Sequence, residues 1–110
     1  MRLTELDPRW AVDADIVIGG VKKHFEGRDG MAVSFECPHC VERERSTGDK
    51  RVTRLAVWFA NPIDGGQPTD DAKTLWLRGG NTFETLTLSP SIDASSDGHW
   101  HGFISNGEIR

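Results

Sequence analysis

The sequence predicts a small all-β domain with little helix. Short stretches in which apolar and polar residues alternate recur along the chain, and clusters of Gly, Pro, Asn and Asp separate them. No stretch repeats its apolar residues at the 3.6-residue spacing of an amphipathic helix. The length of 110 residues leaves room for one hydrophobic core, so we expect a single sheet or sandwich of about six or seven short strands.

We expect residues 1–30 to form an irregular N-terminal extension and residues 31–110 to form the β domain. Inside the extension, residues 16–18 are consecutive β-branched residues followed by two glycines, which predicts a short edge strand. At the start of the domain, residues 31–36 alternate between apolar and polar side chains and lead directly into Cys37. A strand is therefore expected to position this cysteine.

The middle of the chain contains one charged stretch and one strong strand signal. Residues 42–51 are mostly charged and predict a solvated loop or a single helical turn. Residues 52–59 carry apolar side chains two residues apart, which is the clearest strand pattern in the chain. Residues 61–71 are rich in Gly, Pro, Asn and Asp and predict a long loop.

Two further alternating stretches follow this loop. In residues 74–78 the pattern places Leu75 and Leu77 toward the core and Trp76 toward solvent. Residues 85–89 repeat the pattern, again with two leucines facing inward. Both stretches are expected to be strands.

The C-terminal stretch, residues 98–107, reads Gly-His-Trp-His-Gly-Phe-Ile-Ser-Asn-Gly. On a strand, side chains two residues apart share a face, so His99 and His101 would present their imidazoles side by side. The Asn-Gly pair at 106–107 is the strongest hairpin signal in the chain and should fold residues 108–110 back beside the preceding strand.

The two cysteines, Cys37 and Cys40, belong to a Cys-Pro-His-Cys motif with chelating spacing. Zinc binds thiolates and imidazoles, and structural zinc sites have four such ligands in a tetrahedron. Two thiolates also neutralise Zn²⁺, so the cluster can lie against apolar side chains. The sequence therefore predicts one structural zinc ion held by Cys37, Cys40, His99 and His101.

Other interpretations of these residues stay open. The cysteines could be free and buried, with the histidines on the surface. Cys-Pro-His-Cys after a strand is also typical of dithiol oxidoreductases, although that fold requires a long helix after the motif. If only one histidine binds zinc, water could occupy the fourth position of a hydrolase, with Glu36 or Asp97 as the nearest candidate base.

The charge balance restricts the choice of partners. The chain has 13 Lys and Arg against 17 Asp and Glu, a net charge of −4, which argues against a nucleic-acid partner. No apolar stretch has the length of a signal peptide or a membrane span, so we expect a cytoplasmic or particle-borne protein without a membrane partner. Its four tryptophans are more typical of core packing or protein-interface anchors than of base stacking: Trp10, Trp58, Trp76 and Trp100.

Three motifs resemble a known family. Phe-Glu-Cys-Pro-His-Cys at 35–40, Thr-Leu-Thr-Leu-Ser-Pro-Ser-Ile at 85–92 and His-Trp-His-Gly-Phe-Ile-Ser-Asn-Gly-Glu-Ile at 99–109 look like small domains encoded mainly in phages, prophages and bacterial genomes. Some of these domains carry the misleading label ammonia monooxygenase. The resemblance covers residues 31–110 and implies a phage origin but no particular reaction. It also implies four metal ligands, with His101 the firmer histidine: Cys37, Cys40, His99 and His101.

Together these features lead us to expect a small zinc-stabilised phage-type protein that acts by contact with another protein. The partner would be a bacterial host factor or defence system that it inhibits or modulates, or the virion, of which it would be a minor component. The alternative is an enzyme, either a dithiol oxidoreductase or a zinc-dependent hydrolase. The sequence leaves the oligomeric state open.

Overall fold

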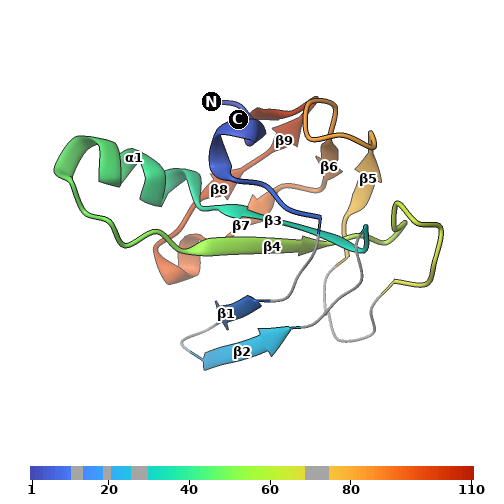
Figure 1. Cartoon of the computed structure of the whole chain (residues 1–110), viewed down its shortest axis with the longest axis horizontal. Coiled ribbons are helices and arrows are strands. Elements are labelled where there is room, and N and C mark those ends of the chain that lie inside the picture. Colours follow the sequence, from blue (N-terminus) through green and yellow to red (C-terminus); the bar gives the residue numbers. More distant parts are fainter. Residues whose placement is uncertain (11–13, 19–20, 26–29, 69–74) are drawn as a thin grey trace.

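Short antiparallel strand pairs make up most of the regular secondary structure in the described part of the protein (Figure 1). The computed structural model describes residues 1–10, 14–18, 21–25, 30–68 and 75–110. These contain one α-helix, α1 (Pro38–Thr47), and two 3-10 turns, η1 (Leu3–Leu6) and η2 (Ser95–Asp97). The strand pairs are β1 (Ala14–Ile18) with β2 (Val21–Phe25), β3 (Ala32–Glu36) with β4 (Arg54–Trp58), β5 (Leu77–Gly79) with β6 (Thr87–Ser89), β7 (Ile92–Asp93) with β8 (His101–Gly102), and β9 (Ile104–Ser105) with β10 (Glu108–Ile109). The predicted class, mostly β with little helix, is confirmed.

The β3–β4 pair is central to the fold and is buried on both faces. Its register pairs Val33 with Val57 and Phe35 with Leu55, and Val33, Phe35 and Val57 are almost completely inaccessible. On the opposite face Ala32 packs in a smaller cluster with Met31 and Trp58. The closely packed strand β3 leads directly into Cys37, so the core positions this cysteine.

The first residues of the chain contribute directly to the core. Leu3 and Leu6 of η1 are fully buried in the main cluster, although residues 1–30 were expected to be irregular. The Leu3 N–H donates to the Gly107 carbonyl at 2.8 Å, and the Ile109 N–H donates to the Met1 carbonyl at 2.9 Å. Both ends of the chain therefore lie together, as Figure 1 shows.

The expected loop or single helical turn at residues 42–51 is wrong for residues 42–47, which belong to the ten-residue helix α1, Pro38–Thr47. Pro38 occupies the first helical position, where its fixed φ and missing N–H are tolerated. Gly48 ends the helix in the left-handed region at φ +75°, and its N–H donates to the Glu44 carbonyl. Only Pro38, Cys40 and Val41 are buried, too few to produce a visible apolar period.

The expected orientation of residues 74–78 is also wrong in part. Leu77 is 64% exposed, whereas Trp76 packs against the main core and its indole N–H donates to the Ser91 carbonyl at 3.3 Å. Trp76 lies in an isolated parallel bridge with Phe59, and β5 begins only at the next residue. This bridge turns the tryptophan inward. Residue 74 lies outside the described residues.

The C-terminal hairpin follows the sequence prediction. Ser105 pairs with Glu108, which leaves Asn106 and Gly107 as a two-residue turn. Both turn residues have positive φ, 49° and 74°, as the turn type favoured by Asn-Gly requires. The inward-facing leucines of the 85–89 stretch, Leu86 and Leu88, are likewise confirmed as buried.

Candidate metal centre

Both cysteines lie where strand β3 passes into helix α1. Cys37 is the N-cap residue and Cys40 lies in the first helical turn, so the turn brings the two sulfurs to one side. The Cys37 N–H donates to the Thr53 carbonyl at 2.8 Å, and the Cys37 carbonyl accepts from the Val41 N–H at 3.0 Å. Both thiols are fully buried and are not joined by a disulfide.

His99 reaches the two cysteines from the other end of the chain. It follows η2 and Gly98, and its N–H donates to the Ala94 carbonyl at 3.0 Å. Its Nδ1 lies 3.5 Å from the sulfur of Cys40. The ligand atoms of Cys37, Cys40 and His99 all lie within 4.8 Å of one another, so these three residues are close enough to hold a metal ion.

The sulfur-to-nitrogen distance matches the edge of a coordination tetrahedron. Zinc–sulfur and zinc–nitrogen bonds at a tetrahedral angle place the two donor atoms about 3.6 Å apart. The observed 3.5 Å between Cys40 and His99 agrees with that separation. For Nδ1 to bind an ion, the ring proton must be on Nε2.

Nearby hydrogen-bond donors surround the sulfurs. Burial raises the pKa of the Cys37 thiol, while the backbone N–H groups of Cys40 and Trp100, which point at its sulfur, act in the opposite direction. The Arg43 guanidinium lies 3.8 Å from the sulfur of Cys40 and also donates to the Arg51 carbonyl at 2.8 Å. Donors of this kind are typical of the shell that orients metal-bound thiolates.

His101 lies outside this group of three residues. It is exposed on β8, where it pairs with Asp93 across the strand pair. The carboxylate of Asp93 accepts hydrogen bonds from Ser95. These bonds, and to a smaller extent the charge of His101, lower the pKa of the Asp93 carboxyl. His99 precedes the strand, so the strand alternation that would align it with His101 does not apply.

The structure describes only some of the other residues considered for this site. Glu36 is half-buried at the end of β3 and is not a member of the group. The side chain of Asp97 lies outside the described part of the structure. Phe103, two residues after His101, is 53% exposed.

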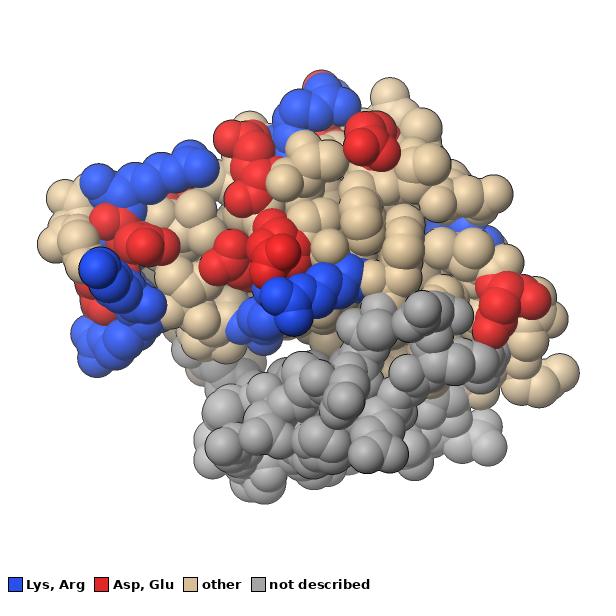
Figure 2. All heavy atoms as spheres, viewed as in Figure 1, with Lys and Arg blue, Asp and Glu red and all other residues tan. Residues whose placement is uncertain are grey.

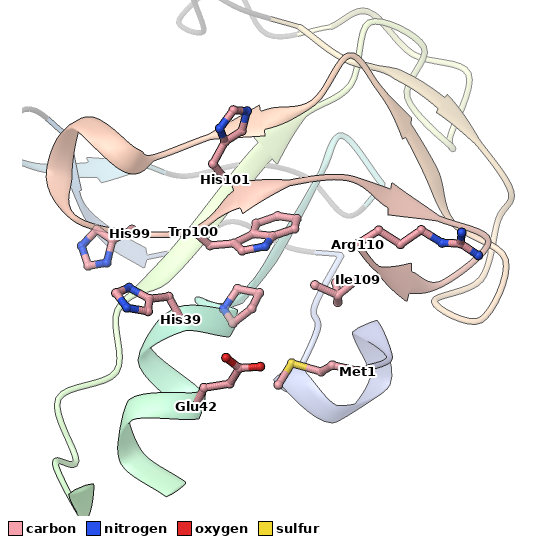
Figure 3. Close-up of a pocket in the computed structure, with 9 residues that line it drawn as sticks. Met1, His39, Glu42, His99, Trp100, His101, Ile109 and Arg110 are labelled. Carbon is pink, nitrogen blue, oxygen red and sulfur yellow. The ribbon is translucent and has the colours of Figure 1, made fainter. Parts of the chain in front are cut away.

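A pocket of about 460 Å³ opens beside His99 (Figure 3). His99 belongs to its wall. On the helix side, His39 holds its Nδ1 3.2 Å from the Gly98 carbonyl. A carbonyl oxygen only accepts, so Nδ1 of His39 must carry the proton. The residues that line the pocket are Met1, Pro38, His39, Glu42, His99, Trp100, His101, Ile109 and Arg110.

Sequence patterns did not assign roles to two residues beside the site. Arg43 was expected in a solvated loop, yet its guanidinium contacts the Cys40 sulfur. His39 is exposed, and its ring also joins α1 to the turn before His99. If residues 38–47 had been predicted as a helix, Arg43 would have been expected next to Cys40, because residues three apart are neighbours on a helix surface.

Comparison with known protein families, with curated proteins and with solved structures finds no match for this chain. Among the described residues, no helix has both the length and the apolar character needed to cross a lipid bilayer.

Proposed function

We propose that this protein binds one zinc ion through Cys37, Cys40 and His99 and that the ion stabilises its fold. The observation that carries the proposal is the convergence of the three ligand atoms within 4.8 Å. Two sulfurs and one imidazole nitrogen form a soft donor set, which suits zinc better than magnesium or calcium.

The location of the site supports a structural role. The ion would join the N-terminus of α1 to a residue 59 positions further along the chain, as the Cys40–His99 contact does. Closing so long a loop removes much of the freedom of the unfolded chain. In small zinc domains, metal binding contributes on the order of 10 kcal/mol to folding.

We further propose that the protein acts by contact with another protein. The resemblance to phage and prophage domains supports a role as an inhibitor or modulator of a bacterial host factor or defence system, or as a minor virion component. Two large apolar side chains, Leu77 and Phe103, are 64% and 53% exposed and would serve as interface anchors. Charges of both signs are mixed over the α1 end of the face in Figure 2, which favours a protein surface over nucleic acid.

The metal content of purified protein tests the first proposal. Protein produced without an affinity tag and passed through gel filtration should retain about one zinc ion per chain, measured by atomic absorption. Cys37→Ser should lose the ion. Protein that binds no zinc when refolded with an excess of it would contradict the proposal.

The protein-contact role is tested by capture from the cytoplasm of a bacterial host. A chain with Leu77→Asp and Phe103→Asp should lose a partner that the unchanged chain retains, because both anchors would carry charge. Zinc content and circular dichroism would establish that the variant is folded. Equal capture of the same partner by both chains would contradict a contact through these residues.

A dithiol oxidoreductase is the second candidate, and one observation favours it. Cys37 follows a strand and stands at the N-terminus of a ten-residue helix, which is the local arrangement of that active site. Zinc-free protein that reduces insulin disulfides, with loss of activity in Cys37→Ser, would support this candidate. Zinc-loaded protein without such activity would support the structural ion.

A further inference from the structure

We infer that the fourth coordination position of the ion opens on the adjacent pocket and binds a small exogenous thiolate. This inference rests on the proposed zinc site and specifies what that site would take as an additional ligand. The site would then be a receptor for small thiols as well as a structural link.

An ion held by these three residues would lie beside the part of the pocket wall that His99 forms. Cys37 and Cys40 are fully buried on the helix side, whereas His99 is half-buried and belongs to the pocket wall. Within the described residues, the metal-binding group contains these three side chains. Structural zinc usually has four protein ligands, and three are typical of a site that keeps a position for an exchangeable ligand.

His101 also lines the pocket, but it is not a member of the three-residue group. It is exposed and its backbone pairs with Asp93 in the β7–β8 register. In Figure 3 its ring points to the opposite side of the strand from His99 and His39. The pocket of about 460 Å³ is within the size range of small-ligand sites.

The donor set favours sulfur in the fourth position. A third thiolate would complete a set of three sulfurs and one imidazole, which zinc adopts in stable sites. The Arg43 guanidinium, 3.8 Å from the Cys40 sulfur, offsets part of the additional negative charge. Pro38 and Trp100 give the pocket apolar surface against which the carbon skeleton of a ligand can pack.

Cobalt substitution with mercaptoacetate as the probe tests this inference. Co²⁺ bound by two thiolates gives a charge-transfer band, and one more thiolate should raise its intensity about 1.5-fold, the ratio of three sulfurs to two. The visible bands should shift at the same time and saturate with one probe per chain. Acetate, which lacks the thiol, should leave the charge-transfer band unchanged.

A matched pair of variants tests the route through the pocket. Glu42 lines the pocket and Glu44 does not, although both belong to α1. Glu42→Trp should weaken mercaptoacetate binding several-fold and leave the cobalt spectrum without probe unchanged, whereas Glu44→Trp should bind the probe normally.

Two results would overturn the inference. One is a cobalt spectrum that does not respond to mercaptoacetate. The other is a spectrum that changes in His101→Ala or Asp97→Asn before any probe is added, because the chain would then supply the fourth ligand itself. The absence of any cobalt–thiolate band would instead overturn the metal proposal as a whole.

Discussion

The candidate metal ligands differ in how far the sequence could predict them. Cys37 and Cys40 were identified from spacing alone, because a helical turn after a strand brings two cysteines three apart to one side. His99 and His101 were expected to act together, yet the structure brings only His99 to the sulfurs. Gly98 turns the chain before His99, and β8 begins only at His101, so the two histidines do not share a strand face. The two-residue spacing of the histidines contains neither feature.

Alanine substitution at each histidine tests whether His99 alone or both His99 and His101 bind the metal. We expect His99→Ala to lower zinc affinity and to reduce the free energy of unfolding by several kcal/mol, since it removes a ligand from a site coupled to folding. His101→Ala should change both quantities little because its side chain is exposed. Zinc titration and urea unfolding would measure these effects, and the reverse order would favour His101 as the ligand.

Two glycines with positive φ should respond differently to alanine. At Gly48 an added Cβ meets nothing within 4 Å, so the cost is that of the left-handed backbone, about 1 kcal/mol. At Gly107 the Cβ would also lie 2.5 Å from the Glu84 carbonyl oxygen, and we expect about 3 kcal/mol. Thermal unfolding of Gly48→Ala and Gly107→Ala provides the comparison. Equal melting temperatures would show that the contact relaxes freely.

At the scale of elements, alternation predicted strands well and failed where a single contact reversed an orientation. Leu86 and Leu88 are buried as expected, but the Phe59–Trp76 bridge turns Trp76 inward and leaves Leu77 exposed. Helix α1 was missed because its buried face consists of so few residues. Long-range pairing of this kind depends on tertiary contacts, which a local pattern does not contain.

Arg54 joins three segments and should be more costly to replace than an arginine whose partner is a near neighbour in sequence. Its guanidinium donates to the Ser34 carbonyl at 3.1 Å and to the Asp7 carbonyl at 2.7 Å, and it pairs with the Asp7 carboxylate at 3.0 Å. We expect Arg54→Met to lower the free energy of unfolding by about 1–2 kcal/mol.

Arg51 is the matched control for that substitution. Its side chain is 87% exposed and pairs with the neighbouring Asp49, so Arg51→Met should leave the free energy of unfolding almost unchanged. Urea denaturation of both variants would measure the difference. Similar losses in the two would show that the Arg54 contacts add little to stability.

At the scale of the whole molecule, the proposed ion joins parts of the chain that the sequence separates widely. We expect acid to release it, because thiolates and imidazole bind metal only when deprotonated and protons compete as the pH falls. Stability from the ion should thus be present at neutral pH and be lost by about pH 4, while a chelator at neutral pH should produce the same lower melting temperature. Zinc retained near pH 4 would contradict these ligands.

Met1 and Arg110 both line the pocket beside the three ligands. Any peptide fused to either residue would therefore begin at the entrance to the coordination site. An oligohistidine fusion would offer its own imidazoles to the ion, so tagged and tag-free preparations should differ in cobalt colour and in their response to added ligands. The same geometry makes either end a suitable place to tether a reporter that senses occupation of the site.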